Sequence, residues 1–251
     1  MKKILVLFKY YNDLKLTISN YKILNEKFGF KILPLYIKDL RTTIPIGSTF
    51  LTSGVVVDTV REFEDEYIEK LKKILKDEGI EEEINIEMGT NKEIIEKYLK
   101  KADLLLMEET EYLDDDFLEI LKAIYKPIII VNKQNSTFEK VAIISDDGIK
   151  INKSASNFFN LFPEYKEATI LSWDYNEEEN NLYEFLKEKG IDLKIELFNS
   201  KFNTKNDFFE RINEFDFIVM GNLSKSFFFE KITKRMGVDL IEKLEKPIFI
   251  G

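Results

Sequence analysis

A glycine turn near the end of the sequence is the first place where this chain could do chemistry. The apolar run 217–220 ends at Gly221, a polar loop follows through Asn222 and Ser224, and a helical pattern comes next. A glycine turn between a strand and a helix presents backbone N–H groups and a helix N-terminus to an anion. This arrangement is typical of a phosphate-binding loop.

The chain lacks both cysteine and histidine, and this restricts its chemistry. Without cysteine there is no disulfide, thiol nucleophile or thiolate metal site. Without histidine there is no Ser-His-Asp or Cys-His catalysis and no usual ligand for a transition metal. An enzyme would have to use Asp, Glu, Lys, Tyr or backbone dipoles, and a metal would have to be a hard cation such as Mg²⁺. The sequence therefore offers no identifiable catalytic residue and no ligand set for a transition metal.

The composition restricts the partners. The chain has 251 residues, of which 44% are hydrophobic and 33% charged, and its net charge is -9. An acidic balance argues against general nucleic-acid binding. No apolar run approaches the roughly 20 residues that span a bilayer, and the opening MKKILVLFKYY is too short in its apolar part for a secretory signal. We expect a cytoplasmic protein without a nucleic-acid or membrane partner.

The elements that must position the glycine turn alternate between strands and helices. Helical patterns such as 58–76 and 92–101 separate the apolar runs. This alternation predicts an α/β fold with a mainly parallel, doubly wound sheet. The expected strands are 3–8, 31–37, 84–88, 103–107 and 127–131 in the first half, and 140–145, 168–173, 193–198, 216–221 and 247–251 in the second.

The second half repeats the plan of the first. ADLLLM recurs as FDFIVM, and KPIIIV recurs as KPIFIG. Repetition of the element order predicts two five-stranded domains, 1–133 and 138–251, rather than a single ten-stranded domain. The polar joint 132–140 is short, so we expect the two domains to pack against each other.

The segment DFIVMG…MGVDLIEKLEKPIFIG and the strand VAIISDD, which ends at Asp146, resemble the universal stress protein family in its tandem form. The resemblance covers nearly the whole chain. It implies two domains similar to adenine nucleotide alpha hydrolases. It also implies that the final strands KPIIIV and KPIFIG pair internally, which would give a pseudo-dimer, while a homodimer of whole chains remains open.

The family's nucleotide-binding members carry three spaced glycines, the last followed by serine or threonine. In this sequence the first falls on Gly221, the second on Ser224, and the last pair on Lys234 and Arg235. The altered loop leaves two readings open: a nucleotide site in which basic side chains replace backbone contacts, or a vacant or differently used pocket. The candidate cofactor is ATP with Mg²⁺, and the candidate nucleotide-binding residues are Asp146, Trp173, Gly221, Asn222, Ser224, Lys234 and Arg235.

The resemblance suggests a role for each of these residues. Asp146 would lie near the ribose or base, and Trp173 would either stack on the base or fill its pocket. Gly221 and Asn222 would offer backbone N–H groups, and Ser224 a hydroxyl. Lys234 and Arg235 would supply positive charge to phosphate.

The first domain departs further from the pattern. Its corresponding loop, 107–116, has no glycine and six acidic residues, and Lys9 stands at the aspartate position of its first strand. The negative charges of these six side chains would repel a polyphosphate, so we predict that this domain has lost the nucleotide site. The acidic run is either a solvated helix start or, less simply, a ligand set for a divalent cation.

Residues 42–57 contain no charge in a chain that is one-third charged. They are expected between the second strand and second helix, either buried against the partner domain or forming a lid over a pocket. The function that the sequence favours is a non-catalytic regulatory protein of the stress response that binds a small ligand or a regulatory protein. The alternative is an ATP-binding protein with slow hydrolysis at the second-domain site.

Overall fold

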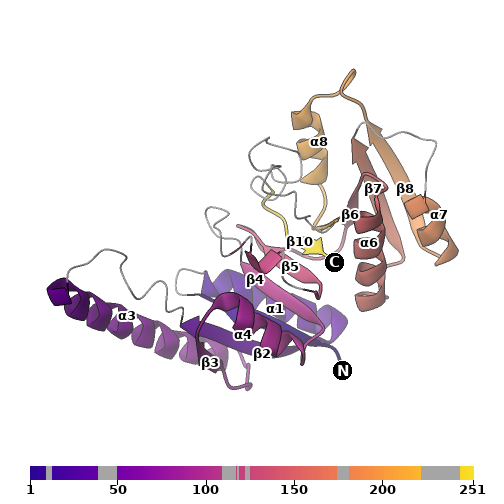
Figure 1. The fold of residues 1–251 in the computed structure, drawn as a ribbon. Coiled ribbons are helices and arrows are strands. Elements are labelled where there is room, and N and C mark those ends of the chain that lie inside the picture. Colours follow the sequence, from indigo (N-terminus) through magenta and orange to yellow (C-terminus); the bar gives the residue numbers. More distant parts are fainter. Residues whose placement is uncertain are drawn as a thin grey trace.

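The computed structural model describes residues 1–9, 13–38, 50–108, 117, 119–121, 125–173, 181–221 and 244–251, with the backbone alone for 50–61. Within these residues the strands form one mixed sheet flanked by helices (Figure 1). The strands are β1 (Lys3–Phe8), β2 (Lys31–Lys38), β3 (Asn85–Met88), β4 (Leu104–Glu108), β5 (Ile128–Val131), β6 (Val141–Ser145), β7 (Glu167–Trp173), β8 (Asp192–Phe198), β9 (Phe217–Met220) and β10 (Ile248–Ile250).

The strand order is β3-β2-β1-β4-β5-β10-β9-β6-β7-β8, which reads as two five-stranded blocks placed end to end. Neighbours within each block are parallel, as in β1 with β2 and β6 with β7. At the centre β5 and β10 are antiparallel, with Ile128 opposite Ile250 and Ile130 opposite Ile248. The predicted α/β fold with a mainly parallel sheet is confirmed, and the final strands of the two halves pair internally. The domain limits 1–133 and 138–251 stay a prediction, because this sheet runs through both halves.

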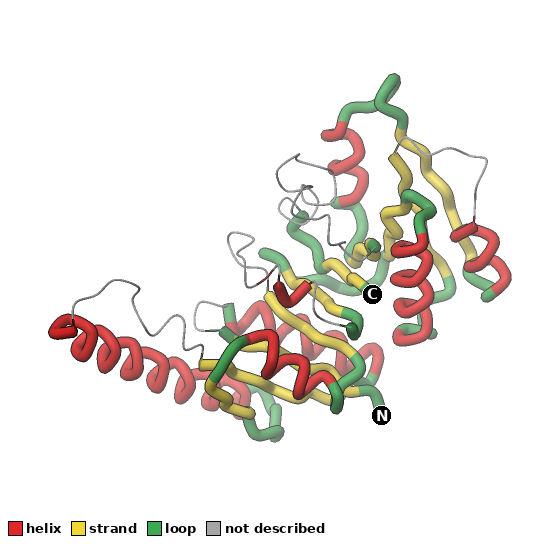
Figure 2. Tube along the Cα trace, in the orientation of Figure 1, coloured by secondary structure: helices red, strands yellow, loops and turns green. Residues whose placement is uncertain are grey.

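The described helices cover both faces of the sheet (Figure 2). They are α1 (Leu14–Phe28), α3 (Phe50–Asp77), α4 (Asn91–Leu99), α6 (Ile149–Leu161), α7 (Asn181–Glu188) and α8 (Lys205–Ile212). Alternate residues of each strand point to opposite faces. Ile4 and Val6 therefore belong to the core on the face that carries α1, α3, α6 and α7, whereas Leu5 and Leu7 belong to the core on the face that carries α4 and α8. The arrangement is doubly wound, as predicted.

Local signals explain where several helices begin and end. Asp13 precedes α1, and its side chain accepts hydrogen bonds from the backbone N–H groups of Lys15 and Leu16. Gly29 ends the same helix with φ of 69°, a left-handed conformation that favours glycine. Thr204 and Asp207 form a reciprocal capping box at the start of α8. Such caps satisfy backbone groups that the helix itself leaves unpaired.

The uncharged segment 42–57 differs from its prediction. Helix α3 begins at Phe50, so residues 50–57 belong to the helix rather than to a connection before it. The first turns of α3 project beyond the sheet, away from the second half of the chain (Figure 1). Residues 50–57 therefore do not lie against the other half. Residues 42–49 lie outside the described part of the chain.

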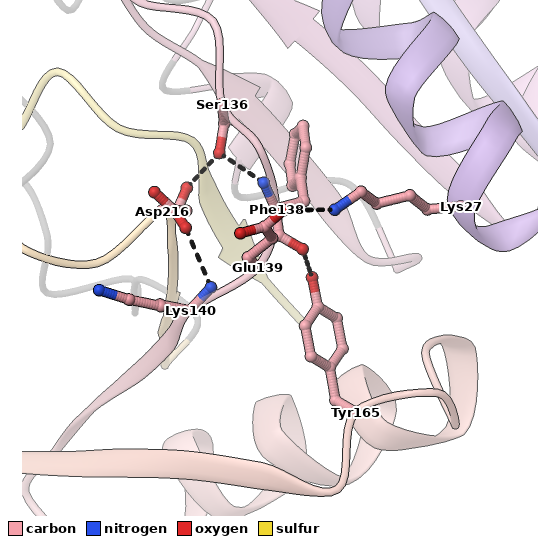
Figure 3. A network of polar contacts seen from close by, with 7 residues as sticks. All are labelled: Lys27, Ser136, Phe138, Glu139, Lys140, Tyr165 and Asp216. Atoms are coloured by element: carbon pink, nitrogen blue, oxygen red, sulfur yellow. Dashed lines mark hydrogen bonds and ion pairs between the residues drawn. The ribbon is translucent and has the colours of Figure 1, made fainter.

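The joint between the halves is fixed by polar contacts (Figure 3). Ser136 Oγ donates to the backbone oxygen of Asp216 at 2.5 Å and accepts from the N–H of Phe138 at 3.0 Å. The Tyr165 hydroxyl donates to the Phe138 carbonyl at 2.6 Å. Burial raises the pKa of Tyr165, which keeps it a hydrogen-bond donor across the physiological range. These contacts hold residues 132–140 against the second half.

The two halves also touch directly. The rings of Phe28 in α1 and Phe162, which follows α6, lie 5.0 Å apart in an edge-to-face arrangement. Lys27 Nζ lies 3.4 Å from Glu139 Oε1. Edge-to-face aromatic pairs contribute about 0.5–1.5 kcal/mol beyond their buried area. The halves are therefore packed against each other, as the short joint predicts.

Candidate functional site

Equivalent contacts place the two halves in a common frame. In the first half the Asp103 carboxylate accepts a hydrogen bond from the N–H of Lys3 at 2.8 Å. In the second half the Asp216 carboxylate accepts one from the N–H of Lys140 at 3.0 Å. Asp216 comes just before β9, which leads to the candidate phosphate loop, and Asp103 comes just before β4, which leads to the corresponding loop of the first half. The residues five positions further on, Glu108 and Gly221, therefore occupy equivalent places at the carboxyl ends of β4 and β9.

Gly221 lies very close to the start of α6. A Cβ atom at this position would be 3.1 Å from the backbone nitrogen of Ile151 and 3.2 Å from Cβ of Lys150. Contacts of that length are tighter than most contacts in packed proteins, and here one of them involves backbone. A larger residue would therefore force the end of β9 and the start of α6 apart by a few tenths of an ångström.

Ser154 strengthens the same approach from inside α6. Its hydroxyl is fully buried and donates to the carbonyl of Met220 at 2.7 Å. It also accepts from the N–H of Gly251 at 2.8 Å. One side chain therefore connects α6 to the ends of both β9 and β10, directly before Gly221.

Asp146 lies at the carboxyl end of β6, where the sequence predicts a nucleotide-binding aspartate. Its side chain is exposed, and Oδ1 accepts from the N–H of Gly148 at 3.0 Å. Gly148 precedes α6 and supplies no side-chain cap to it. The structure therefore brings Asp146, Gly148 and Gly221 to the N-terminal end of α6, at the point where the sheet order reverses between β6 and β9.

The neighbouring Asp147 is a structural residue that the sequence reasoning missed. It has a φ of 52°, and its carboxylate accepts from the N–H groups of Asn181 and Leu182, both at 2.8 Å. A carboxylate at a helix N-terminus satisfies unpaired donors and favours the helix dipole. Asp147 thus positions α7. The second aspartate of the sequence SDDG was the available signal.

Trp173 ends β7, and its ring packs on Phe208 of α8 with centroids 5.6 Å apart. It lies among the partly buried residues of the α4 and α8 side of the core. Its predicted contact with a base stays a prediction. Asn222, Ser224, Lys234 and Arg235 lie outside the described residues, so their predicted roles are likewise open.

In the first half, the Glu108 side chain reaches the start of α1. Its Oε1 accepts from the N–H of Asp13 at 3.0 Å, and its Oε2 accepts from the Thr17 hydroxyl at 3.0 Å. Thr17 occupies in α1 the place of Ser154 in α6, since both are the buried hydroxyl residues facing the strand ends. The Glu108 carboxylate therefore lies beside the start of α1, at the position equivalent to Gly221 in the second half. The remaining acidic residues of that loop, 109–116, lie outside the described part.

Lys9, at the aspartate position of the first strand, is 8% exposed. Its carbonyl accepts a hydrogen bond from the Tyr67 hydroxyl of α3 at 2.5 Å. Nearby, the Tyr36 hydroxyl donates to Glu64 Oε1 at 3.4 Å. Burial raises the pKa of the Glu64 carboxyl, because water no longer stabilises its charged form. This end of the first half is bound together by its own side chains.

The described residues contain no group of three or more His, Cys, Asp or Glu side chains that could hold a metal ion. They also include no helix that is long and apolar enough to cross a membrane.

Solved structures share this fold over the whole chain. A universal stress protein from Archaeoglobus fulgidus DSM 4304 matches 99% of this chain and 95% of its own, with 14% identity and a TM-score of 0.65. A functionally unknown protein from Pseudomonas aeruginosa PAO1 matches 100% and 92%, with 11% identity and a TM-score of 0.53. No protein-family model and no curated protein sequence matches. At the level of fold, the resemblance to tandem universal stress proteins is confirmed.

Proposed function

We propose that this chain, which has the fold of the universal stress proteins, is a non-catalytic regulatory protein of the stress response in the cytoplasm. It acts by binding a small ligand or a regulatory protein at the carboxyl end of the sheet in its second half, beside Asp146, Gly148 and Gly221. Open α/β sheets bind ligands in the crevice at such a switch point. The observation that carries the proposal is the difference between Gly221 and Glu108. Gly221 itself places no side chain beside the start of α6, whereas Glu108 extends a carboxylate to the start of α1.

The chemistry of the crevice favours a ligand with hydrogen-bonding and anionic groups. Asp146 is exposed at one wall, and the N-terminal end of α6 lies beside Gly221. A helix N-terminus attracts negative charge, while an exposed carboxylate accepts hydrogen bonds from hydroxyl or amino groups. An adenine nucleotide offers both kinds of group, which makes it the first ligand to test.

The absence of histidine and cysteine from the sequence supports a binding role over a catalytic one. The alternative function is ATP binding with slow hydrolysis, which would require Mg²⁺ near Asp146. The retained Gly221 favours this alternative, because it preserves the close approach of strand and helix that a phosphate loop uses.

Calorimetric titration with ATP and Mg²⁺, together with native mass spectrometry of the purified protein, separates these functions. Binding without phosphate release supports a ligand-binding regulator, and phosphate release that requires the crevice supports the alternative. If millimolar ATP produces no heat of binding and no nucleotide co-purifies, nucleotide binding is excluded both with and without hydrolysis. The remaining hypothesis is then binding of a protein partner. The matched control is Gly221→Glu, which introduces the residue of the first half and should abolish binding in the second.

If nucleotide binds, Arg235→Ala should weaken binding by about 1–3 kcal/mol, because a charge-assisted contact to phosphate is lost. Lys201→Ala, at an exposed turn, serves as the control for a removed positive charge. An unchanged affinity for the Arg235 variant would mean that its guanidinium does not contact the phosphate.

A further inference from the structure

Strand β8 is the last strand of the sheet at the end of the second half, and within the described residues it pairs with β7 alone. The N–H of Asp192 donates to the carbonyl of Lys166 at 2.7 Å, toward β7. In a parallel strand, the backbone groups of successive residues point alternately to the two sides. The backbone N–H and C=O groups of Leu193, Ile195 and Leu197 therefore point away from the sheet.

The same three residues carry apolar side chains on one face of this edge. Ile195 is 39% exposed and Leu197 is 45% exposed, although both lie in a regular seven-residue strand. A long edge strand with outward backbone groups and exposed apolar residues is a template for pairing with another strand. Most proteins shorten or bend such edges, which makes this one a candidate interaction surface.

The sequence of β8 is complementary to itself when the strand is reversed. In an antiparallel pair centred on Ile195, the two Ile195 residues face each other and Leu193 faces Leu197 on both sides. Lys194 then faces Glu196 twice. Because the outward backbone groups belong to Leu193, Ile195 and Leu197, this register also aligns every outward N–H with an outward C=O across the pair.

Other symmetric registers are less favourable. A pair centred on Lys194 places lysine opposite lysine, and one centred on Glu196 places glutamate opposite glutamate. Like charges directly opposite each other destabilise a strand pair, and opposite charges stabilise it. A pair centred on Leu193 leaves the end of the strand unpaired. Among these registers, only the one centred on Ile195 pairs all seven residues and places residues of opposite charge across from each other.

We propose that β8 is a dimerisation edge, at which a second copy of this chain adds its own β8 antiparallel in the register centred on Ile195. The two-fold axis passes between the Ile195 residues, and the two sheets become continuous. A second copy is the occupant that fits, because the pattern of charges and apolar residues matches its own reverse. An unrelated peptide has no reason to match it.

Arg211 orients one of the charged side chains of β8 that this register pairs, that of Glu196. Its guanidinium contacts both carboxylate oxygens of Glu196, at 2.7 and 2.6 Å, on the side of the sheet covered by α8. The contact fixes the Glu196 side chain on the face where Lys194 also lies. In the dimer, each Glu196 carboxylate would lie between Arg211 of its own chain and Lys194 of the other copy.

The opposite edge of the sheet lacks this complementarity. Strand β3 has four residues, and the N–H of Gly89, just after it, donates to Lys38 of β2 at 3.2 Å. Its outward residues are therefore Ile86 and Met88, which are 41% and 64% exposed. No symmetric register of the sequence NIEM brings opposite charges together, so β3 provides a matched negative control.

Engineered cysteines test the register directly, because the natural chain contains none. Residues that exchange both backbone hydrogen bonds across antiparallel strands have Cα atoms about 5.5 Å apart, within disulfide range. Ile195→Cys should give a disulfide-linked dimer on mild oxidation, and Ile86→Cys should give only a slow background. Adding Lys194→Glu to the Ile195→Cys chain should slow cross-linking about tenfold, because glutamate then faces glutamate twice.

Sedimentation velocity of the unmodified full chain provides the equilibrium measurement. One strand pair buries less than the roughly 1,200 Å² of stable complexes, so we expect a weak dimer that appears as concentration rises. Lys194→Glu should weaken its association about tenfold, and Lys133→Glu, on the exposed joint, should leave it unchanged. A monomer at every concentration, a dimer insensitive to Lys194→Glu, or equal cross-linking of Ile195→Cys and Ile86→Cys would each overturn the proposal.

Discussion

The two halves of this protein share a scaffold but end their central strands differently. In both, the aspartate before the central strand accepts a hydrogen bond from the N–H of a lysine at the start of the half's first strand or directly before it: Asp103 from Lys3, and Asp216 from Lys140. In both, the strand runs to a methionine and then meets the start of the first helix. After that methionine, the first half has Glu108 and the second has Gly221.

This difference shows how one residue changes what the same scaffold offers to a ligand. Glu108 places both carboxylate oxygens on α1 and thereby uses donors at the start of that helix. Gly221 has no side chain that could make such a contact, and it lets the strand approach the helix backbone closely. A repeated fold can therefore keep its frame in both copies while the residue at the end of the central strand differs between them.

The largest effect is expected from adding a side chain at Gly221, which makes the second half resemble the first. Gly221→Ala should reduce the free energy of unfolding by about 1–3 kcal/mol, because the new Cβ would lie 3.1 Å from the backbone nitrogen of Ile151. Urea denaturation measures the change. Asp146→Ala, in the same crevice but exposed, should cost less, and equal costs for the two variants would contradict the crowding that we infer.

The reverse change in the first half should have a somewhat smaller effect. Glu108→Ala should lower the free energy of unfolding by about 1–2 kcal/mol, because the hydrogen bonds from Asp13 and Thr17 lose their acceptor. Glu108→Gln keeps one acceptor oxygen and should recover part of the loss in the same urea experiment. If the alanine variant is as stable as the natural chain, the carboxylate does not hold α1.

The smallest expected effect concerns pH and belongs to the first half. Burial raises the pKa of Glu64 above the ordinary value of 4.5, so the folded chain binds this proton more tightly than the unfolded chain. The resulting stability is present below the unfolded pKa and is lost as pH rises through the folded pKa.

Glu64→Gln should therefore flatten the fall in stability above about pH 4.5, with a difference of about 1 kcal/mol or less. Thermal unfolding followed from pH 4 to pH 8 would show it. Glu66→Gln, exposed on the same helix, should leave the profile unchanged. A profile of the Glu64 variant that matches that of the natural chain would mean that this carboxyl titrates normally.

Much of the fold could be predicted from the sequence, because buried parallel strands appear as short apolar runs separated by helical patterns. The expected strands 3–8 and 31–37 match β1 and β2 closely. The start of α3 was missed by eight residues. Glycine and β-branched residues, which have low helix propensity, dominate 54–57, and the charged helical pattern begins only at Asp58.

The candidate site was less predictable. Asp146 and Gly221 could be found from the ends of apolar runs, and the structure brings both to the start of α6. The role of Glu108 could not be found, because the sequence presents it as one charge in an exposed acidic run. Its partners lie 95 and 91 residues away in the chain.

By itself, the sequence determined the alternation of strands and helices, the repeated halves and the lack of histidine and cysteine chemistry. These depend on local patterns and residue types. Only the tertiary structure decided which helix start is occupied by a side chain, that β5 and β10 join the halves, and that β8 remains an edge. Those features depend on contacts between distant residues, which no local pattern specifies.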